Sequence, residues 1–365
     1  MPASQFSNIQ PKRILVITMR YLGDTLLVTP LIGALRQAYP EAEIDVLLPA
    51  ANCGMLMGNR HVNRLIPLVS KDILSFAGLL FSLFRQYDLA ISTQAGDRPL
   101  LSALIAGKYS MGFIAANTAK YSWKRLLLDS ALAFNVQQNH AVLENLRFCQ
   151  PLNIAPSYVL MPPRQADEQS IELPEGKYAV LHIMPQWRYK QWHDAGWLAV
   201  TEYLQSRGIR VVLTGSNQAQ EQAMLTALQQ QLPANVLNLA GSLSLAQLTG
   251  LIEKATVFIG PDTGITHLAA ATGIPVVAIF GPTDPKIWAP WPVGYADDKS
   301  PFVSQGSQHS ANIYIVQGQS EQGCVPCQLE GCQRSRQSQS DCLDNLSAAN
   351  VLDALNIILS QTPGF

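Results

Sequence analysis

The sequence predicts an α/β protein with two doubly wound, Rossmann-like domains that face a central cleft. Three observations lead to this prediction. Short buried strands alternate with amphipathic helices in both halves of the chain, as expected for parallel sheets covered by helices on both faces. The length of 365 residues exceeds that of one typical domain. A proline-rich stretch at residues 150–176 interrupts the alternation near its middle.

The first half of the chain alternates strand and helix signals from its start. "RILVIT" (Arg13–Thr18) predicts a buried strand because its branched apolar residues follow one another. A helix is expected over Asp24–Ala38, where "YP" ends it. Further strands are expected at Ile44–Pro49, Asp88–Thr93 and Tyr109–Phe113. These elements form the first predicted domain, residues 1–160.

The most apolar run of the sequence is "ILSFAGLLFSLF", Ile73–Phe84. It is far shorter than the roughly 20 residues that a membrane-spanning helix needs. We expect a helix packed on the sheet. A membrane-surface helix is the alternative, although only Lys71 and Arg85 flank the run with positive charge. The polar N-terminus lacks the apolar core of a signal peptide, so we expect a cytoplasmic protein.

The alternation restarts after a predicted linker at residues 161–176. Strands are expected at Lys177–Ile183, Ile209–Gly215, Val236–Gly241, Thr256–Gly260 and Ile274–Gly281, and helices at Trp192–Gly208, Asn217–Leu232, Ser244–Ala255 and Gly264–Thr272. They form the second predicted domain, residues 177–345, and a C-terminal helix follows within 346–365. Two such domains leave a cleft at the carboxyl ends of their strands, where ligands of open α/β sheets bind.

The composition restricts the classes of partner. Charged residues make up 14% of the chain and the formal net charge is -1. This balance argues against a disordered, solvating chain and provides no overall attraction to nucleic acid, so we expect no nucleic-acid partner. Any surface that binds anions has to be local.

A helix start between two apolar runs carries several small polar residues: "PDTGITHLAAATGIPVVAIFGPTDP", Pro261–Pro285. Asp262 or Thr263 can cap the helix, and Gly264 lets a ligand approach the backbone. The N–H groups of the first turn attract an anion. Thr263 and His267 are four residues apart and share one helix face. The alternative is an ordinary helix start, with His267 as a hydrogen-bonded core residue.

Two further segments place polar residues at strand ends. "HIMPQWRYKQW" follows the first strand of the second domain and contains Arg188 and Lys190. Two cations beside a helix N-terminus suit a diphosphate. In the first domain, "RYLGDTLLVTP" places Asp24 after a strand, where an acid either caps the helix or faces the cleft. The same segment and "STQAGDR" supply other polar candidates: Arg20, Gly23, Gln94 and Arg98.

Four of the six cysteines lie close together near the C-terminus, in a segment spanning residues 324–342. Cys324, Cys327, Cys332 and Cys342 have the spacing C-x₂-C-x₄-C-x₉-C. Thiolates at such short separations suit a structural zinc or iron ion. Disulfides are the weaker explanation in a reducing compartment, and unliganded thiols are the other interpretation. Cys53 and Cys149 are expected to be buried fillers.

These segments together resemble the heptosyltransferases of lipopolysaccharide assembly, glycosyltransferase family nine. The matching pieces are "GDTLLVTPLIGALRQAYPEAEIDVL", "RYKQW", "PDTGITHLAAATGIPVVAIFGPTDP" and "WAPWP", in family order between Arg13 and Pro292. "RYKQW" and "WAPWP" most resemble the branch that adds the third heptose of the inner core, or an equivalent branching sugar.

The resemblance implies a GT-B fold in which the second domain binds ADP-heptose and the first binds the lipid-linked lipopolysaccharide core. It implies that Asp24 is the general base and that Lys190 contacts the diphosphate. An acidic residue for the ribose is implied between Ser216 and Glu221, with Glu221 as the candidate. The implied donor-binding residues are Arg188, Thr214, Gly215, Ser216, Glu221, Leu243 (on adenine), Asp262, Thr263, Gly264 and His267, and the acceptor-binding residues are Arg20, Gly23, Gln94 and Arg98.

The implied reaction is a single displacement that inverts the anomeric configuration. No Asp-x-Asp motif occurs, so we expect no catalytic cofactor or divalent metal. "KYSWKRLLLD" (Lys120–Asp129) is expected to be a solvated helix face, with a contact to acceptor phosphates or to the cytoplasmic face of the inner membrane as the alternative. Two other functions stay open: a GT-B enzyme with another nucleotide sugar or a 2-epimerase-like reaction, and a non-catalytic nucleotide-binding protein.

Overall fold

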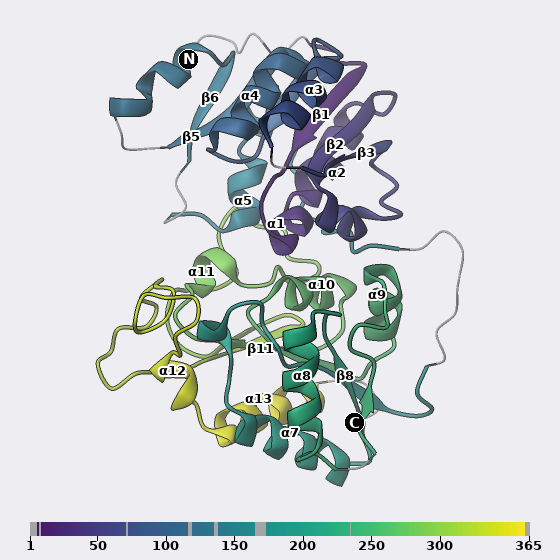
Figure 1. Cartoon of the computed structure of the whole chain (residues 1–365), viewed down its shortest axis with the longest axis vertical. Helices are drawn as coiled ribbons and strands as arrows, with labels where there is room; N and C mark the ends of the chain where they lie inside the picture. Colours follow the sequence, from purple (N-terminus) through teal and green to yellow (C-terminus); the bar gives the residue numbers. More distant parts are fainter. Residues whose placement is uncertain are drawn as a thin grey trace. The chain divides into compact units, whose positions relative to one another are not determined.

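The computed structural model describes residue 6 and residues 9–70, 72–115, 119–134, 138–164, 173–233 and 235–361 (Figure 1). The chain divides into two compact units, Met1–Pro163 and Arg164–Phe365. The central part of the predicted linker, residues 165–172, lies outside the described residues. Each unit is built around one sheet, and the α/β fold class expected from the sequence is confirmed.

The first unit contains a six-stranded sheet in the order β3-β2-β1-β4-β5-β6, with every pair parallel. Its strands are β1 (Arg13–Ile17), β2 (Glu43–Pro49), β3 (Arg64–Leu68), β4 (Tyr87–Ser92), β5 (Gly107–Ala115) and β6 (Ser130–Phe134). Its helices are α1 (Leu22–Leu27), α2 (Thr29–Ala38), α3 (Ile73–Leu83), α4 (Asp97–Ala106), α5 (Ala141–Leu146) and α6 (Cys149–Leu152), with 3₁₀ helices η1 (Ala50–Leu56) and η2 (Ala119–Leu126).

The single helix expected over Asp24–Ala38 is wrong in one respect. The structure has two helices, α1 and α2, which are separated at Val28. Pro30 lies in the first turn of α2. Proline lacks an N–H and its ring displaces the carbonyl one turn earlier, so it is tolerated at a helix start but not inside a continuous helix.

The second unit contains a seven-stranded sheet in the order β12-β13-β11-β10-β7-β8-β9. Its strands are β7 (Tyr178–His182), β8 (Arg210–Thr214), β9 (Leu237–Asn238), β10 (Val257–Pro261), β11 (Val276–Phe280), β12 (Gln308–Ser310) and β13 (Ile313–Gln317). Its helices are α7 (Asp194–Ser206), α8 (Ala219–Gln229), α9 (Leu245–Glu253), α10 (Gly264–Thr272), α11 (Pro285–Trp288), α12 (Asp341–Asp344) and α13 (Ala348–Ser360), with the 3₁₀ turn η3 (Arg188–Lys190). The short edge strand β12 is antiparallel to β13, whereas the other described pairs are parallel.

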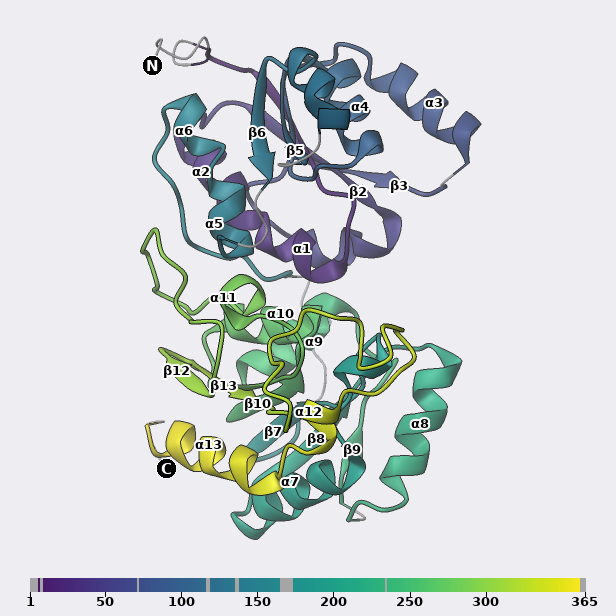
Figure 2. The same cartoon turned by 90° about the vertical axis from the view of Figure 1, so that its left-hand side faces the viewer.

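The C-terminal helix α13 belongs to the second unit. It packs beside α7 and against the sheet (Figure 2), and Val351, Leu355 and Ile358 enter the same core as β7 and β8. The indole N–H of Trp192 donates to the carbonyl of Leu346 at 2.9 Å, which fixes the chain just before α13. This helix therefore completes the second core.

Sequence patterns missed four strands, β3, β6, β12 and β13. Pro67 lies inside β3, and proline is tolerated there because β3 is an edge strand. The expected strand Val236–Gly241 is reduced to the two residues of β9. Three of the missed strands, β3, β6 and β12, are edge strands, which are often short and have weak patterns. The fourth, β13, lies inside the sheet and was missed although its sequence IYIVQ is apolar.

No helix within the described residues combines the length and the apolar character needed to cross a bilayer.

Candidate functional site

Each sheet has a position where the strand order reverses, and the candidate residues follow strands at these positions. In the first unit the reversal lies between β1 and β4, and in the second unit between β7 and β10. Ligands of open α/β sheets bind beyond the carboxyl ends of the strands at such a point. In the second unit Lys190 follows β7, Thr214 ends the adjacent β8, and Asp262 follows β10.

An ion pair joins two of these strand ends. The Lys190 Nζ lies 2.6 Å from Oδ2 of Asp262. The side chains are 20% and 7% exposed, so the pair is largely removed from water. The backbone N–H of Asp262 donates to the carbonyl of Ile279 at 3.1 Å and anchors the acid to β11. Charged pairs with this little solvent hold their geometry closely, because separating them leaves an uncompensated charge.

The start of α10 has the form that the sequence predicted. Thr263 is its N-cap, with an extended backbone, and its hydroxyl accepts the N–H of Thr266 at 3.4 Å. Gly264 is the first helical residue, so no side chain projects from that position of the first turn. The helix dipole and the remaining N–H groups make this end attractive to a negatively charged group.

His267, one turn into α10, is buried and neutral. Burial lowers its pKa to about 4, and the charges of Asp262 and Lys190 have smaller, opposing effects. Within the described residues its Nδ1 atom has no hydrogen-bond partner. A core histidine with all its hydrogen bonds made, the alternative considered from the sequence, is therefore not what the structure contains. A buried polar atom without a partner is costly unless a ligand or water completes it.

The loop after β8 wraps around a carboxylate. The N–H of Ser216 donates to Oε1 of Glu221 at 2.7 Å, and the Ser216 hydroxyl contacts the other carboxylate oxygen. A Cβ atom at Gly215 would lie 2.5 Å from that carboxylate, so only glycine allows this approach. Glu221 is thereby held at the start of α8, next to the end of β8.

Sequence reasoning missed His182, the last residue of β7. Its Nδ1 lies 3.2 Å from the hydroxyl of Thr214, directly opposite it on β8. Burial lowers its pKa to about 4. The signal was present in the sequence, because a histidine ended a predicted central strand at the edge where ligands bind. Of the other donor candidates, Arg188 is exposed in η3 and Leu243 is half-buried between β9 and α9.

In the first unit, a second group of candidates lies around the ends of β1 and β4. The Gln94 side-chain oxygen accepts the N–H of Met19 at 2.9 Å and joins the two strand ends. Its Nε2 atom is buried without a hydrogen-bond partner in the described chain. Asp24 and Gly23 lie in the first turn of α1, beyond β1.

Asn52, which the sequence did not single out, supports the same turn. It donates to the carbonyl of Arg20 at 2.8 Å and to the Thr25 hydroxyl at 3.0 Å. The exposed Arg20 side chain lies over the ring of Phe134, and Arg98 lies over Phe76 of α3, 5.1 Å from its centroid. The structure therefore brings Gln94 to the turn before Asp24 and places Arg98 against α3.

The sequence model of glycosyltransferase family 9 (heptosyltransferase) matches residues 82–310. Lipopolysaccharide heptosyltransferase 3 of Escherichia coli K12 is 30% identical over 290 residues, which are 75% of this chain and 83% of that protein. The chain belongs to glycosyltransferase family 9.

Solved structures of this family have the same fold. The family 9 glycosyltransferase of Veillonella parvula superposes with a TM-score of 0.76 at 17% identity, over 96% of this chain and 98% of that one. The Escherichia coli ADP-heptose lps heptosyltransferase II superposes with a TM-score of 0.72 at 22% identity, over 96% and 99%. The resemblance stated from the sequence, the GT-B fold class and the assignment as a transferase are confirmed.

The cysteine-rich segment of this heptosyltransferase does not support the structural zinc or iron ion that the spacing suggested. Each of the six cysteines is a free thiol. Cys324 contacts the hydroxyl of Ser320, and the Cys332 sulfur accepts the N–H of Asp341. Burial, reinforced by the charges of the other three, raises the pKa of Cys342 to about 12. The described residues contain no group of three or more His, Cys, Asp or Glu side chains placed to hold a metal ion.

The same segment instead packs on the η3 turn. The N–H of Arg188 donates to the carbonyl of Arg336 at 3.1 Å, and the Arg336 guanidinium lies over the Trp187 ring. The Ser340 hydroxyl donates to the carbonyl of Tyr189 at 2.7 Å. The loop that follows β7 in this family 9 enzyme is thus held from one side by residues 330–340.

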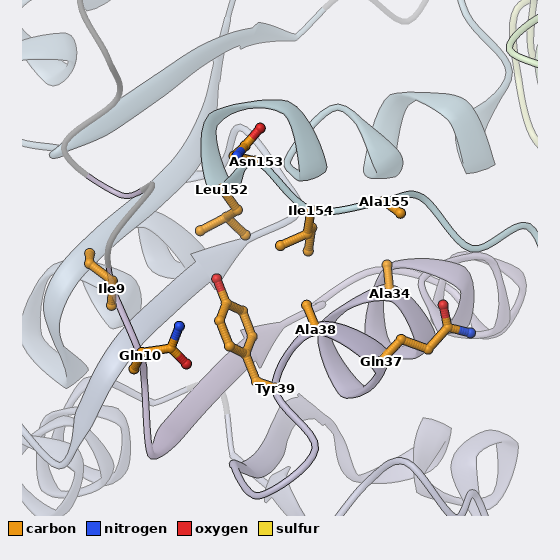
Figure 3. Close-up of a pocket in the computed structure, with 10 residues that line it drawn as sticks. All are labelled: Ile9, Gln10, Ala34, Gln37, Ala38, Tyr39, Leu152, Asn153, Ile154 and Ala155. Carbon is orange, nitrogen blue, oxygen red and sulfur yellow. The ribbon is translucent and has the colours of Figure 1, made fainter.

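A pocket in the first unit lies away from these residues. It has a volume of about 330 Å³ and is lined by the chain before β1, the end of α2 and the chain after α6 (Figure 3). Gln10, which lines it, precedes β1, whereas Asp24 follows the other end of that strand. The pocket contains none of the predicted site residues of this heptosyltransferase.

Proposed function

We propose that this heptosyltransferase transfers heptose from ADP-heptose to the inner core of lipopolysaccharide, with inversion at the anomeric carbon. The observation that carries the proposal is the Lys190–Asp262 pair next to the Gly264 turn of α10, together with Nδ1 of His267, which has no hydrogen-bond partner among the described residues. The names of the relatives, which include a lipopolysaccharide and an ADP-heptose heptosyltransferase, support the substrates.

The donor would be held by the second unit. Lys190, Arg188 and the first turn of α10 provide positive charge for the diphosphate, and Asp262, Thr263, Gly264 and His267 surround it. In this proposal Glu221, with Thr214, Gly215 and Ser216, accepts a hydrogen bond from a ribose hydroxyl of the donor. Leu243 supplies an apolar side chain for the adenine. In this proposal, protein cations and N–H groups neutralise the diphosphate, which a divalent metal ion does in other enzymes. Catalysis therefore needs no divalent metal ion.

The acceptor would be held by the first unit, with Arg20, Gly23, Gln94 and Arg98 as its contacts. Asp24 removes the proton of the acceptor hydroxyl as that oxygen attacks the anomeric carbon. The bond from the anomeric carbon to the diphosphate oxygen breaks at the same time. ADP leaves, and its negative charge is stabilised by Lys190 and the α10 start.

A lipid-linked acceptor implies that the enzyme works at a membrane. The donor is a nucleotide sugar, and the acceptor core is attached to lipid. We therefore place the reaction at the cytoplasmic face of the inner membrane, with the enzyme as a peripheral protein.

The substitution Asp24→Asn tests this proposal. It should reduce transfer by roughly 10²–10⁴-fold, because a general base contributes that much. The Kd of ADP-heptose, measured by calorimetry in the presence of a chelator, should change less than twofold. Glu41→Gln, which neutralises an exposed acid of the same unit, is the control and should retain the wild-type rate.

Two outcomes would contradict the proposal. A near-wild-type transfer rate for Asp24→Asn would exclude Asp24 as the general base. Tighter binding of uridine than of adenine diphosphate sugars, or a strict need for magnesium, would remove the donor assignment.

A further inference from the structure

Helix α3 is apolar on both of its faces. Phe76, Leu80 and Leu83 are buried, and Leu83 enters the core beneath the helix together with residues of β1 and β4. The opposite face also carries large apolar side chains, which face water: Leu74 is 84% and Phe81 86% exposed. A soluble helix on a sheet normally has a polar outer face, so this arrangement needs a separate explanation.

The apolar surface continues over the neighbouring elements. Helix α4 packs against α3 (Figure 1), and α4 and η2 line a shallow pocket of about 440 Å³. Leu104 lies in this pocket, and Leu126 of η2 is 87% exposed. We define the outer apolar face as the exposed residues Ile73, Leu74, Phe81, Phe84, Leu101, Trp123, Leu126 and Leu127.

These elements all cover the same side of the first sheet. The core beneath α3 and α4 contains Leu15, Ala90 and Ala103, and the adjoining core beneath α4 contains Leu100, Ile114 and Leu128. The outer apolar face is therefore the outside of one helical layer. Its extent over three elements exceeds the scattered single apolar side chains that are normal on a protein surface.

The charges of the described side chains in this layer are positive in balance. Between Val69 and Phe134 these side chains include five Lys and Arg and four Asp, a balance of 5 - 4 = +1, whereas the whole chain has -1. The acids are already engaged: Asp97 pairs with Lys124, and Asp88 with Lys108 at 2.9 Å.

The other two acids are engaged by hydrogen bonds instead. Asp72 caps α3 by accepting the N–H of Ser75, and Asp129 accepts the N–H of Ser110.

Two arginines of the layer keep uncompensated charge. Arg85 donates to the carbonyl of Gly107 at 2.7 Å, and Arg125 is exposed on η2. Neither makes an ion pair with any residue that the structure describes. Exposed Leu, Phe and Trp side chains next to unneutralised arginines match an anionic lipid surface, which receives apolar groups between its headgroups and attracts the cations.

We propose that the outer apolar face docks the enzyme on an anionic phospholipid bilayer. The proposal rests on the proposed function, because the lipid-linked acceptor is anchored in such a bilayer. Docking inserts side chains of α3 and η2 among the headgroups, with Arg85 and Arg125 at the level of the phosphates. The helix packed on the sheet that the sequence predicted is confirmed for Ile73–Leu83. The proposal adds to it the membrane contact that the sequence left as the alternative.

Flotation with lipid vesicles tests the proposal. Wild-type enzyme should float with vesicles of phosphatidylethanolamine and phosphatidylglycerol and much less with phosphatidylcholine alone. Combining Leu74→Gln with Phe81→Gln should reduce the bound fraction at least tenfold. Val303→Gln is the matched control, because Val303 is a 64% exposed apolar residue of the second unit, and it should bind like the wild type.

A second variant keeps the test independent of folding defects in α3. Leu126→Gln changes only η2 and should also weaken flotation, with an unchanged thermal unfolding temperature. Arg85→Gln with Arg125→Gln should weaken binding to the anionic vesicles alone. Wild-type enzyme that stays with the unbound fraction, or a Leu74/Phe81 variant that floats as the wild type does, would overturn the proposal. The proposal would also be overturned if the wild type formed a dimer and did not bind vesicles, and the Leu74/Phe81 variant were a monomer. The outer apolar face would then be an interface with a second copy of the chain.

Two soluble assays separate this proposal from the proposed function. The Leu74/Phe81 variant should bind ADP-heptose normally and should transfer to a deacylated core acceptor at the wild-type rate. Its transfer to acceptor embedded in vesicles should fall. If vesicle binding depends on the face but ADP-heptose does not bind the wild type, the docking surface stands and the proposed donor falls.

Discussion

The ammonium of Lys190 lies 2.6 Å from the carboxylate of Asp262 and joins the chain after β7 to the chain after β10. The two residues are 72 positions apart in the sequence. The pair presents a cation beside the first turn of α10, and the carboxylate holds that cation in place. In the proposed reaction the ammonium of Lys190 contacts both the donor diphosphate and the carboxylate of Asp262.

Removing the Lys190 side chain should lower both the stability of the protein and its affinity for the donor, and a second substitution can distinguish the two effects. Lys190→Ala leaves Asp262 buried without its counter-charge, which should cost about 3 kcal/mol in urea unfolding. Adding Asp262→Asn removes the stranded charge, so the double variant should recover part of that stability. ADP-heptose should bind at least tenfold more weakly to both variants in calorimetry. A Lys190→Ala protein that binds ADP-heptose like the wild type would exclude a diphosphate contact.

Gly331 should matter to donor binding although it lies in the cysteine-rich segment. Its φ is 84°, and a Cβ there would overlap the hydroxyl of Ser338 and lie 3.0 Å from the Cβ of Tyr189, in η3. Gly331→Ala should therefore displace the turn that carries Arg188 and Lys190 and raise the KM for ADP-heptose several-fold. Gly323→Ala is the matched control, because Gly323 has φ 63° but nothing within 4 Å of its added Cβ. Both substitutions have a similar backbone cost of roughly 1–2 kcal/mol. Equal KM values for the two variants would contradict a positioning role for this loop.

Substituting Glu221 should weaken binding of the ribose part of the donor and leave binding of the diphosphate part unchanged. Its carboxylate accepts the N–H of Ser216 and lies at the end of β8. If it also accepts a ribose hydroxyl, Glu221→Gln should weaken ADP binding about tenfold through the lost charge-assisted hydrogen bond. Binding of inorganic diphosphate, which has no ribose, should not change. The exposed Glu202→Gln serves as the control. Equal losses for ADP and diphosphate would indicate a general disturbance of the loop.

His182 should make the stability of the enzyme depend on pH. Burial lowers its pKa from 6.5 to about 4, so the folded state holds it neutral while the unfolded state takes up a proton first. This contribution to stability is present above pH 6.5 and is lost as the pH falls toward 4, by roughly 3 kcal/mol.

The matching experiment compares wild type with His182→Gln in urea between pH 7 and 4. As the pH falls from 7 to 4, the free energy of unfolding of the wild type should decrease relative to that of His182→Gln by roughly 3 kcal/mol. His309→Gln, which removes an exposed imidazole, should show no such shift relative to wild type. A constant difference for His182→Gln would mean that its imidazole is not held neutral.

The local patterns of this sequence were strong enough to predict much of the fold. Runs such as "RILVIT" and "TVFIG" became the central strands β1 and β10, because a strand buried on both faces has to be apolar throughout. The edge strands β3 and β12 were missed because Pro67 and polar residues weaken their patterns, whereas the interior strand β13 was missed despite its apolar run. The helix break at Val28 was also missed. Apolar residues recur with helical spacing on both sides of Val28, whereas the helical backbone hydrogen bonds are interrupted there.

By itself, the sequence determined the alternation of strands and helices, a helix cap at Asp262 or Thr263, the glycine that follows and the strand ends that carry Lys190 and Asp24. These features depend on neighbouring residues, whose side chains and backbone act over a few positions. The tertiary structure decided the rest. Only folding brings Lys190 to Asp262 and leaves Nδ1 of His267 without a hydrogen-bond partner among the described residues. Within the same residues the cysteines form no group placed to hold a metal ion. Folding also decides that one apolar face of α3 is buried while the other faces water, because exposure depends on what the rest of the chain covers.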